Sequence, residues 1–137
     1  MYIRSDAGVQ CYSRSNDRGL SWTPVEKSQL VSPLSPASIE RIPETGDLLA
    51  VWNYNRSTNK RVSKQRTPLN LAISKDDGVS WQNIKELEND PDGRYCYTAI
   101  EFINGAVLFG YASGSQSAKT HWGLTKIIKV DLPWIYQ

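Results

Sequence analysis

The chain has 137 residues, 39% of them hydrophobic and 22% charged, with a net charge of +2. This length and composition fit a soluble globular protein with one real core. So small and mixed a charge argues against nucleic acid or a membrane surface as a partner. No run of about 18 apolar residues is present, so no membrane-spanning helix is predicted.

Metal, cofactor and disulfide chemistry find little support in the sequence. The two cysteines, Cys11 and Cys96, are too few for a disulfide framework and do not have metal-ligand spacing, so we predict two half-buried thiols. His121 is the single histidine. The segments 76–78 and 90–93 are rich in aspartate but lack the full set of oxygen ligands of a calcium loop. No metal and no cofactor is predicted.

The N-terminal half contains short alternating segments broken by turn residues. We expect strands over residues 9–15 and 21–27, with a turn at 16–19 between them. A connector rich in proline and serine covers 32–36. Residues 37–43 and 48–55 then form a hairpin across the Glu-Thr-Gly-Asp turn at 44–47.

The C-terminal half continues the pattern. Residues 69–75 and 80–87 form a hairpin across Asp-Asp-Gly, and residues 96–103 and 106–113 flank Asn104-Gly105, the strongest short hairpin signal in the chain. A last strand covers about 121–131. No convincing amphipathic helix is present. The chain is therefore predicted to be all-β, with closely spaced antiparallel strands in a sandwich, barrel or propeller.

An internal repeat favours the propeller. Two octapeptides, at 15–22 and 74–81, share the pattern S-x-D-x-G-x-S-W and lie 59 residues apart. A period of about 50–60 residues with about four strands per repeat is typical of propeller blades. Four of the shared positions in each copy are Ser15, Asp17, Gly19 and Trp22, and Ser74, Asp76, Gly78 and Trp81.

The pattern has a structural explanation within the turn. The aspartate can accept backbone N–H bonds, as in Asx-turns. The glycine supplies the positive φ that other residues resist, and the tryptophan packs over the hairpin. Asp17 and Asp76 are therefore predicted to be structural rather than catalytic.

This repeat is the Asp-box, and the sequence resembles the sialidase (neuraminidase) superfamily over nearly its whole length. The resemblance implies a six-bladed β-propeller of which this chain forms the C-terminal part, as about three four-stranded antiparallel blades. Residues 1–31 would form an incomplete blade, 32–90 a complete blade and 91–137 the last blade. The chain would be too short for the complete ring, which needs about 330–360 residues at this period.

The resemblance assigns two arginines to a triad that grips the substrate carboxylate. Arg4 ends a strand shortly before the first Asp-box, and Arg66 lies in the segment 65–74, which leads into the second. Arg56 is a rival for the role of Arg66. Arginine suits a carboxylate because its planar fork donates two parallel charge-assisted hydrogen bonds.

The segment 94–100, Arg-Tyr-Cys-Tyr-Thr-Ala-Ile, is similar to the one that carries the sialidase nucleophile. Tyr97 fits best and Tyr95, expected on the same strand face, is the alternative. A neutral tyrosine suits a substrate with a carboxylate on its anomeric carbon, which would repel a carboxylate nucleophile. Glu101 lies too far along the strand to act as the base, and Glu40 is a candidate for lining the central cavity.

The implied activity is exo-α-sialidase hydrolysis of terminal sialic acid from glycans by a retaining mechanism, without a cofactor. One arginine, the Asp acid/base and the Glu partner of the tyrosine would lie upstream of Met1, so the chain alone is expected to be inactive. A sialidase-like hydrolase of another sugar and a non-catalytic carbohydrate-binding module are the alternatives. Exposed blade faces would favour self-association. The compartment stays open, because residues 1–6 lack a signal peptide's apolar core but a secreted or periplasmic parent is compatible with that.

Overall fold

The computed structural model of the chain describes residues 1–55 and 65–137. The described residues form ten strands in three antiparallel sheets and one five-residue helix, so the prediction of an all-β fold is confirmed. Arg56 lies outside the described residues. Within the described part of the chain, no helix has the length and apolar character needed to cross a membrane.

Each sheet is built from strands that follow one another along the chain. The first sheet contains β1 (Tyr2–Ile3), β2 (Val9–Tyr12) and β3 (Glu26–Val31). The central sheet contains β4 (Ser38–Arg41), β5 (Leu48–Trp52), β6 (Leu69–Ser74) and β7 (Gln82–Glu88). The last sheet contains β8 (Gly93–Ile103), β9 (Ala106–Ser115) and β10 (Leu124–Asp131).

The core lies on both faces of the central sheet. All six residues of β6 are buried, which is the pattern of a strand covered on both faces rather than on one. On one face, Leu49 and Ile73 join a cluster with Phe109 and Tyr111 of the last sheet. On the other face, Trp52 packs with Leu30 of the first sheet and donates a hydrogen bond to the carbonyl of Val31 at 3.0 Å.

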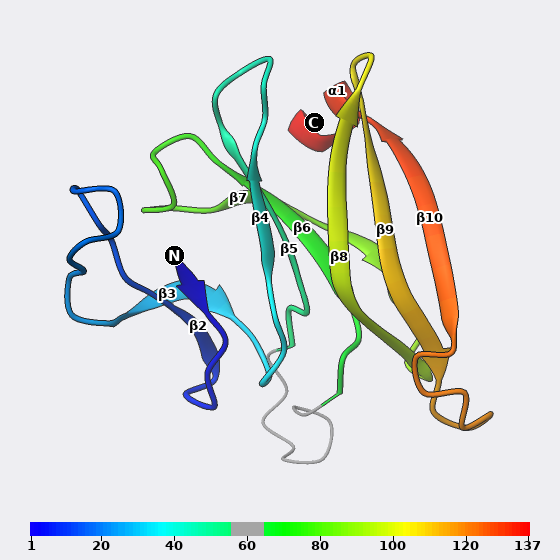
Figure 1. Cartoon of the computed structure of the whole chain (residues 1–137). Helices are drawn as coiled ribbons and strands as arrows, with labels where there is room; N and C mark the ends of the chain where they lie inside the picture. Colours follow the sequence, from blue (N-terminus) through cyan, green and yellow to red (C-terminus); the bar gives the residue numbers. More distant parts are fainter. Residues whose placement is uncertain (56–64) are drawn as a thin grey trace.

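The three sheets form an open arc rather than a closed ring (Figure 1). This is the arrangement of a partial β-propeller. The turn between β8 and β9 and the C-terminus lie at one end of the arc, which is the upper end in Figure 1. The β1–β2 connection, the start of β8 and the β9–β10 connection lie at the lower end. Since Arg4 follows β1 and Tyr97 lies early in β8, both belong to that lower end.

Two local features differ from the sequence-based expectations. The strand expected over 21–27 begins only at Glu26, because Thr23 is held in the turn by hydrogen bonds: its amide donates to Arg14 O at 2.8 Å, and its Oγ1 accepts from Arg14 N at 3.0 Å. A helix, α1 (Leu132–Tyr136), follows β10 and was not expected. Five residues are too few to show a helical period. It forms because Leu132 and Ile135 enter the core.

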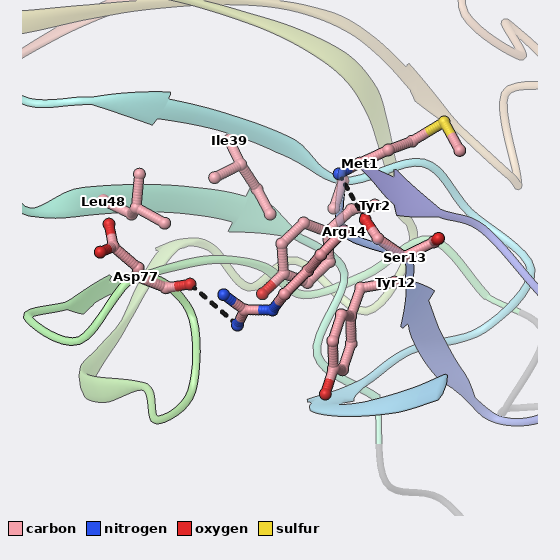
Figure 2. A pocket seen from close by; sticks show the side chains of 9 residues that line it. Met1, Tyr2, Tyr12, Ser13, Arg14, Ile39, Leu48 and Asp77 are labelled. Carbon is pink, nitrogen blue, oxygen red and sulfur yellow. Dashed lines mark hydrogen bonds between the residues drawn. The ribbon is translucent and has the colours of Figure 1, made fainter. Parts of the chain in front are cut away.

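A pocket of about 410 Å³ lies between the first and central sheets (Figure 2). Tyr2 and Tyr12 line the pocket from strands of the first sheet, and Arg14 lines it from the connection between β2 and β3. Ile39 and Leu48 line it from the central sheet. None of the predicted site residues Arg4, Arg66 and Tyr97 lines this pocket. It is a gap between neighbouring sheets rather than the candidate site.

Candidate functional site

The two Asp-boxes have the same hydrogen-bond geometry. In the first box, Asp17 Oδ1 accepts from Ser21 N at 2.9 Å and Oδ2 accepts from Ser21 Oγ at 2.6 Å. In the second, Asp76 makes the corresponding bonds to Ser80 at 2.8 and 2.6 Å. These bonds, led by the serine hydroxyl, lower the pKa of each aspartate from 3.8 to about 2. Both carboxylates are therefore occupied within their own turns.

The serine and glycine of each box complete the turn. Ser15 Oγ accepts a hydrogen bond from Gly19 N at 2.7 Å, and Ser74 Oγ accepts one from Gly78 N at 2.8 Å. Gly19 and Gly78 have φ of +90° and +85°, values that residues with a side chain seldom adopt. The Trp22 indole donates to the Gly19 carbonyl at 3.1 Å and stays 47% exposed, while Trp81 is half-buried and packs against Tyr2.

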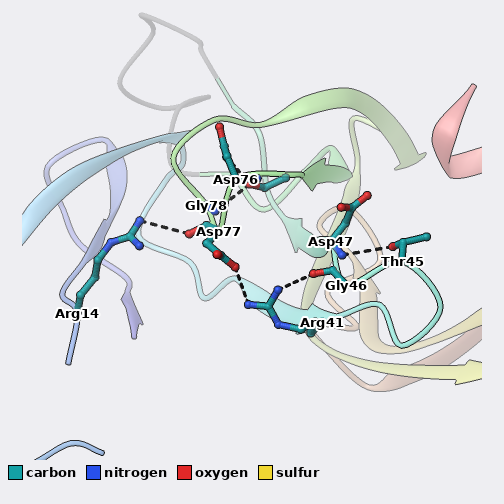
Figure 3. A network of polar contacts seen from close by, with 9 residues as sticks. Arg14, Arg41, Thr45, Gly46, Asp47, Asp76, Asp77 and Gly78 are labelled. Atoms are coloured by element: carbon teal, nitrogen blue, oxygen red, sulfur yellow. Dashed lines mark hydrogen bonds and ion pairs between the residues drawn. The ribbon is translucent and has the colours of Figure 1, made fainter. Parts of the chain in front are cut away.

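The second box also joins the first sheet to the central sheet. The Tyr2 hydroxyl donates to the carbonyl of Gly78 at 3.1 Å. The Arg14 guanidinium donates to the carbonyl of Asp77 at 3.2 Å (Figure 3). The Asp77 carboxylate pairs with Arg41 at 2.7 Å. These contacts belong to the end of the arc away from Tyr97 and hold two sheets together.

The segment that carries Arg66 is fixed directly against β8. The backbone N–H of Tyr95 donates to the carbonyl of Arg66 at 3.0 Å. Thr67 Oγ1 donates to the carbonyl of Asp90 at 2.8 Å, and Asn53 Nδ2 donates to the carbonyl of Tyr95 at 3.2 Å. This backbone bond and the side-chain bonds of Asn53 and Thr67 together hold Arg66 at the start of β8.

Arg66 lies in a corner made by two aromatic rings. Its guanidinium carbon is 5.7 Å from the centre of the Tyr97 ring and 4.9 Å from that of Trp122. The two rings meet edge to face, with their centres 6.4 Å apart. These distances are within the range of cation–π contacts. The structure therefore brings the predicted residues Arg66 and Tyr97 together and adds Trp122.

The Arg66 guanidinium has hydrogen-bonding capacity left over. Nη2 donates to the carbonyl of Leu34 at 3.4 Å, a long bond. Nη1 is buried and makes no hydrogen bond to an oxygen or nitrogen acceptor among the residues that the structure describes, and the neighbouring Cys96 thiol is at most a weak acceptor. A buried charged donor without an acceptor is unfavourable. The hydrogen-bonding capacity of the Arg66 guanidinium is therefore not fully met in the free chain.

Tyr97 reaches the surface because β8 has a bulge. The pairing of β8 with β9 shifts between Cys96 and Ala99, and Tyr97 itself has φ of +56°. A bulge of this kind redirects a side chain. Tyr97 is 59% exposed, whereas Tyr95 is buried. The expectation that the two tyrosines share a strand face is therefore wrong.

Tyr95, the alternative nucleophile, belongs to the core. Its ring packs edge to face against Tyr111, with centres 6.1 Å apart. Burial, with a smaller contribution from the nearby Glu88 and Asp90 carboxylates, raises the pKa of its hydroxyl to about 12. A buried phenol that resists ionisation is poorly suited to attack a substrate.

Both cysteines are free and buried. The Cys96 thiol lies next to the site. Burial raises its pKa, and the Arg66 guanidinium acts in the opposite direction. A buried thiol of raised pKa behaves as a small apolar side chain. We therefore treat Cys96 as a packing residue beside Arg66 rather than as a reactive group.

The remaining candidates lie apart from the corner. Arg4 is exposed after β1, and no side-chain hydrogen bond joins it to Tyr97 in the described part of the chain. Glu40 is exposed on β4, and Glu101 is exposed on β8 beyond the bulge. No carboxylate of the described residues forms a hydrogen bond to the Tyr97 hydroxyl. Across residues 1–55 and 65–137, no cluster of His, Cys, Asp or Glu side chains could hold a metal ion.

Sequence reasoning missed Trp122. It lies in the connection between β9 and β10 and is 40% exposed. Its contact with Arg66 spans more than 50 residues of sequence, so no local spacing could indicate it. An exposed tryptophan in a loop beside the last strand was the one available signal.

A comparison of the chain with models of protein families finds a repeat family, in agreement with the two Asp-boxes. The model of the BNR repeat-like domain matches residues 1–108, which is more than half of the chain. A search of curated proteins finds no match to the chain. The two Asp-boxes, the three consecutive antiparallel sheets and this match agree with one another. The chain belongs to the BNR repeat-like domain family.

Proposed function

We propose that the chain carries part of the active site of a sialidase-type glycoside hydrolase, with Arg66 as a carboxylate-binding residue and Tyr97 as the nucleophile. The observation that supports this most strongly is the corner itself. A guanidinium with a buried unpaired nitrogen lies against an exposed tyrosine that a bulge turns out of the sheet. One group suits a carboxylate and the other suits attack on the adjoining carbon.

The reaction proposed is a retaining hydrolysis. The Tyr97 oxygen forms a bond to the anomeric carbon while the bond to the departing glycan oxygen breaks. The phenol proton passes to a carboxylate base, and the glycan oxygen takes a proton from a carboxylic acid. Water then releases the sugar from Tyr97. No described carboxylate forms a hydrogen bond to the Tyr97 hydroxyl, so the proposal takes the base from another segment of polypeptide. The acid belongs beside the departing glycan oxygen, and the proposal takes it from outside the described residues as well.

Arg4 is proposed as a second carboxylate-binding residue. It follows β1 at the same end of the arc as the β8 start (Figure 1) and is exposed, so its guanidinium is available to a ligand. A ligand that spans the two arginines would connect them.

The test is hydrolysis of a fluorogenic sialoside by the chain joined to the upstream blades of a six-bladed ring, beside the chain alone. We expect turnover in the complete ring only, reduced by about 10³-fold or more in Tyr97→Phe. Tyr12→Phe is the matched control, because Tyr12 lines the pocket between the first two sheets. Full activity of Tyr97→Phe would contradict the assignment of the nucleophile.

A non-catalytic carbohydrate-binding module is the second candidate. It is favoured by the absence of a carboxylate at the Tyr97 hydroxyl among the described residues. A folded complete ring that binds a sialoside but does not hydrolyse it would support this alternative. Loss of that binding in Arg66→Gln, with binding intact in Tyr97→Phe, would place the carboxylate at Arg66.

A further inference from the structure

We propose that Trp122 is a specificity-determining residue of this site, an aromatic wall that contacts the apolar face of a sugar whose carboxylate binds Arg66. The inference rests on the proposed function and adds to it a residue that contacts the substrate. The substrate is a saturated ring bearing a carboxylate, and its C–H groups next to the charged end are what Trp122 would contact.

The exposed part of Trp122 lies beside the Arg66 guanidinium, where the carboxylate of the sugar would bind. The indole covers one side of the Arg66 guanidinium at 4.9 Å and meets the Tyr97 ring at 6.4 Å, yet 40% of the residue stays exposed. A carboxylate approaches a guanidinium along its edge, in the plane of the fork. Bound there, its carbon skeleton would extend over the aromatic surface beside the guanidinium.

The loop that carries Trp122 is held in place by Asp92. The Asp92 carboxylate accepts hydrogen bonds from Ser117 N and Ser117 Oγ, both at 2.8 Å, and from the hydroxyl of Ser115. The backbone carbonyl of Asp92 accepts from Gln116 N at 2.9 Å. The hydrogen bonds to the carboxylate, led by the one from Ser115, lower the pKa of Asp92. Asp92 immediately precedes β8, so the same short segment positions Tyr97 and Trp122.

A second anchor comes from Gly114 on β9. A methyl group in place of its hydrogen would overlap the backbone carbonyl of His121, so the loop lies directly on this glycine. The loop closes with Ser115 N donating to Thr120 Oγ1 at 2.8 Å and Gly123 N donating to the Thr120 carbonyl at 2.8 Å. The backbone of the loop that carries Trp122 is therefore fixed by hydrogen bonds and by close packing on Gly114.

Of the seven non-glycine residues with positive φ in the described part of the chain, three are Tyr97 and two neighbours of Trp122 in the β9–β10 connection. Lys119 and His121 have φ of +54° and +50°, and Tyr97 has φ of +56°. Residues with side chains adopt such values at a cost of order 1–3 kcal/mol each, and they cluster at binding sites. Two of the three lie within three residues of Trp122, and the third is the proposed nucleophile.

The test is titration of the chain with N-acetylneuraminic acid, followed by tryptophan fluorescence and by calorimetry. We expect Trp122→Ala to weaken binding about fivefold to tenfold and Trp122→Phe to stay within about threefold of the wild type. The fluorescence change on binding should disappear in Trp122→Phe. Trp134→Ala is the matched control: Trp134 is 38% exposed under Lys85, but it lies in α1 at the opposite end of the arc.

The Arg66→Gln variant separates the test of the carboxylate site from the test of the contact with Trp122. Affinity lost in Arg66→Gln but unchanged in Trp122→Ala would overturn the role of Trp122 and leave the carboxylate site standing. A wild-type chain that binds no N-acetylneuraminic acid would overturn the carboxylate site, and with it the wall. Equal weakening by Trp122→Ala and Trp134→Ala would also contradict the inference, because it would show a general loss of stability.

Discussion

Each Asp-box aspartate has both carboxylate oxygens engaged by a serine four residues later in its own turn. The bonds favour the ionised form, which is why the pKa of Asp17 and of Asp76 lies near 2 rather than 3.8. These aspartates are structural groups, and their titration should appear in stability rather than in catalysis.

A depressed pKa in the folded state gives stability that is present above the unfolded pKa. It is lost as the pH falls through the folded pKa. We therefore expect the melting temperature to fall between about pH 4 and pH 2, and the fall to be shallower in the Asp17→Asn/Asp76→Asn double variant. Thermal unfolding followed by circular dichroism at several pH values measures this. Parallel profiles for variant and wild type would contradict it.

Gly78 and Gly19 occupy equivalent turn positions but have different surroundings. Both have positive φ, yet a methyl group on Gly78 would overlap the Tyr2 hydroxyl, whereas one on Gly19 would meet only Trp22 at 3.8 Å. Gly78→Ala adds a steric clash to the backbone strain that both substitutions introduce.

We expect Gly19→Ala to lower the free energy of unfolding by about 1 kcal/mol and Gly78→Ala by about 2–4 kcal/mol. Urea denaturation of the two variants gives the difference directly. Equal losses would show that the contact between Tyr2 and Gly78 does not constrain the turn.

At the scale of the element, the β9–β10 connection is held by bonds within its own turn and by the Asp92 carboxylate, which lies outside it. Lys119 lies in this connection and is exposed, so it offers a site for trypsin that a fixed loop protects. Removal of the carboxylate would release Ser115 and Ser117 together.

We expect Asp92→Ala to speed tryptic cleavage after Lys119 at least several-fold, with Asp92→Asn intermediate because its amide oxygen still accepts hydrogen bonds. Asp6→Ala, at an exposed position near the N-terminus, is the control. Mass spectrometry of the early fragments identifies the cut. Unchanged cleavage in Asp92→Ala would show that the loop is held by other contacts.

Local elements were predictable and distant contacts were not. The hairpin at Asn104-Gly105 and the two Asp-box turns follow from residues adjacent in sequence, and the structure has them at those places. The bulge at Tyr97 depends on how β8 pairs with β9, and α1 depends on a core that accepts Leu132 and Ile135. The proximity of Arg66, Tyr97 and Trp122 needs three separate segments, so sequence reasoning found the first two only through resemblance.

At the scale of the whole molecule, the open arc leaves strand edges and apolar side chains unpaired. β10 is the edge strand of the last sheet, and Ile127 on it is 73% exposed. A row of free backbone groups beside exposed apolar side chains favours pairing with another chain. We therefore expect the isolated chain to self-associate as its concentration rises.

Ile127→Lys places a charge on that edge and should shift the association to higher concentration, as seen by sedimentation velocity. Leu20→Lys is the matched control, because Leu20 is more exposed, at 89%, but lies in the first Asp-box turn rather than on an edge strand. Equal effects of the two substitutions would point to general solubility instead of edge pairing.

The most direct test of the proposed site is to trap the sugar on the protein. A sialosyl fluoride with a second fluorine beside the anomeric carbon would react in the complete ring with loss of fluoride, while the second fluorine slows release. Digestion and mass spectrometry then locate the sugar. An adduct on Tyr97, absent from Tyr97→Phe, is the predicted result. An adduct on another residue, or none in a ring that hydrolyses sialosides, would contradict the assignment of Tyr97 as the nucleophile.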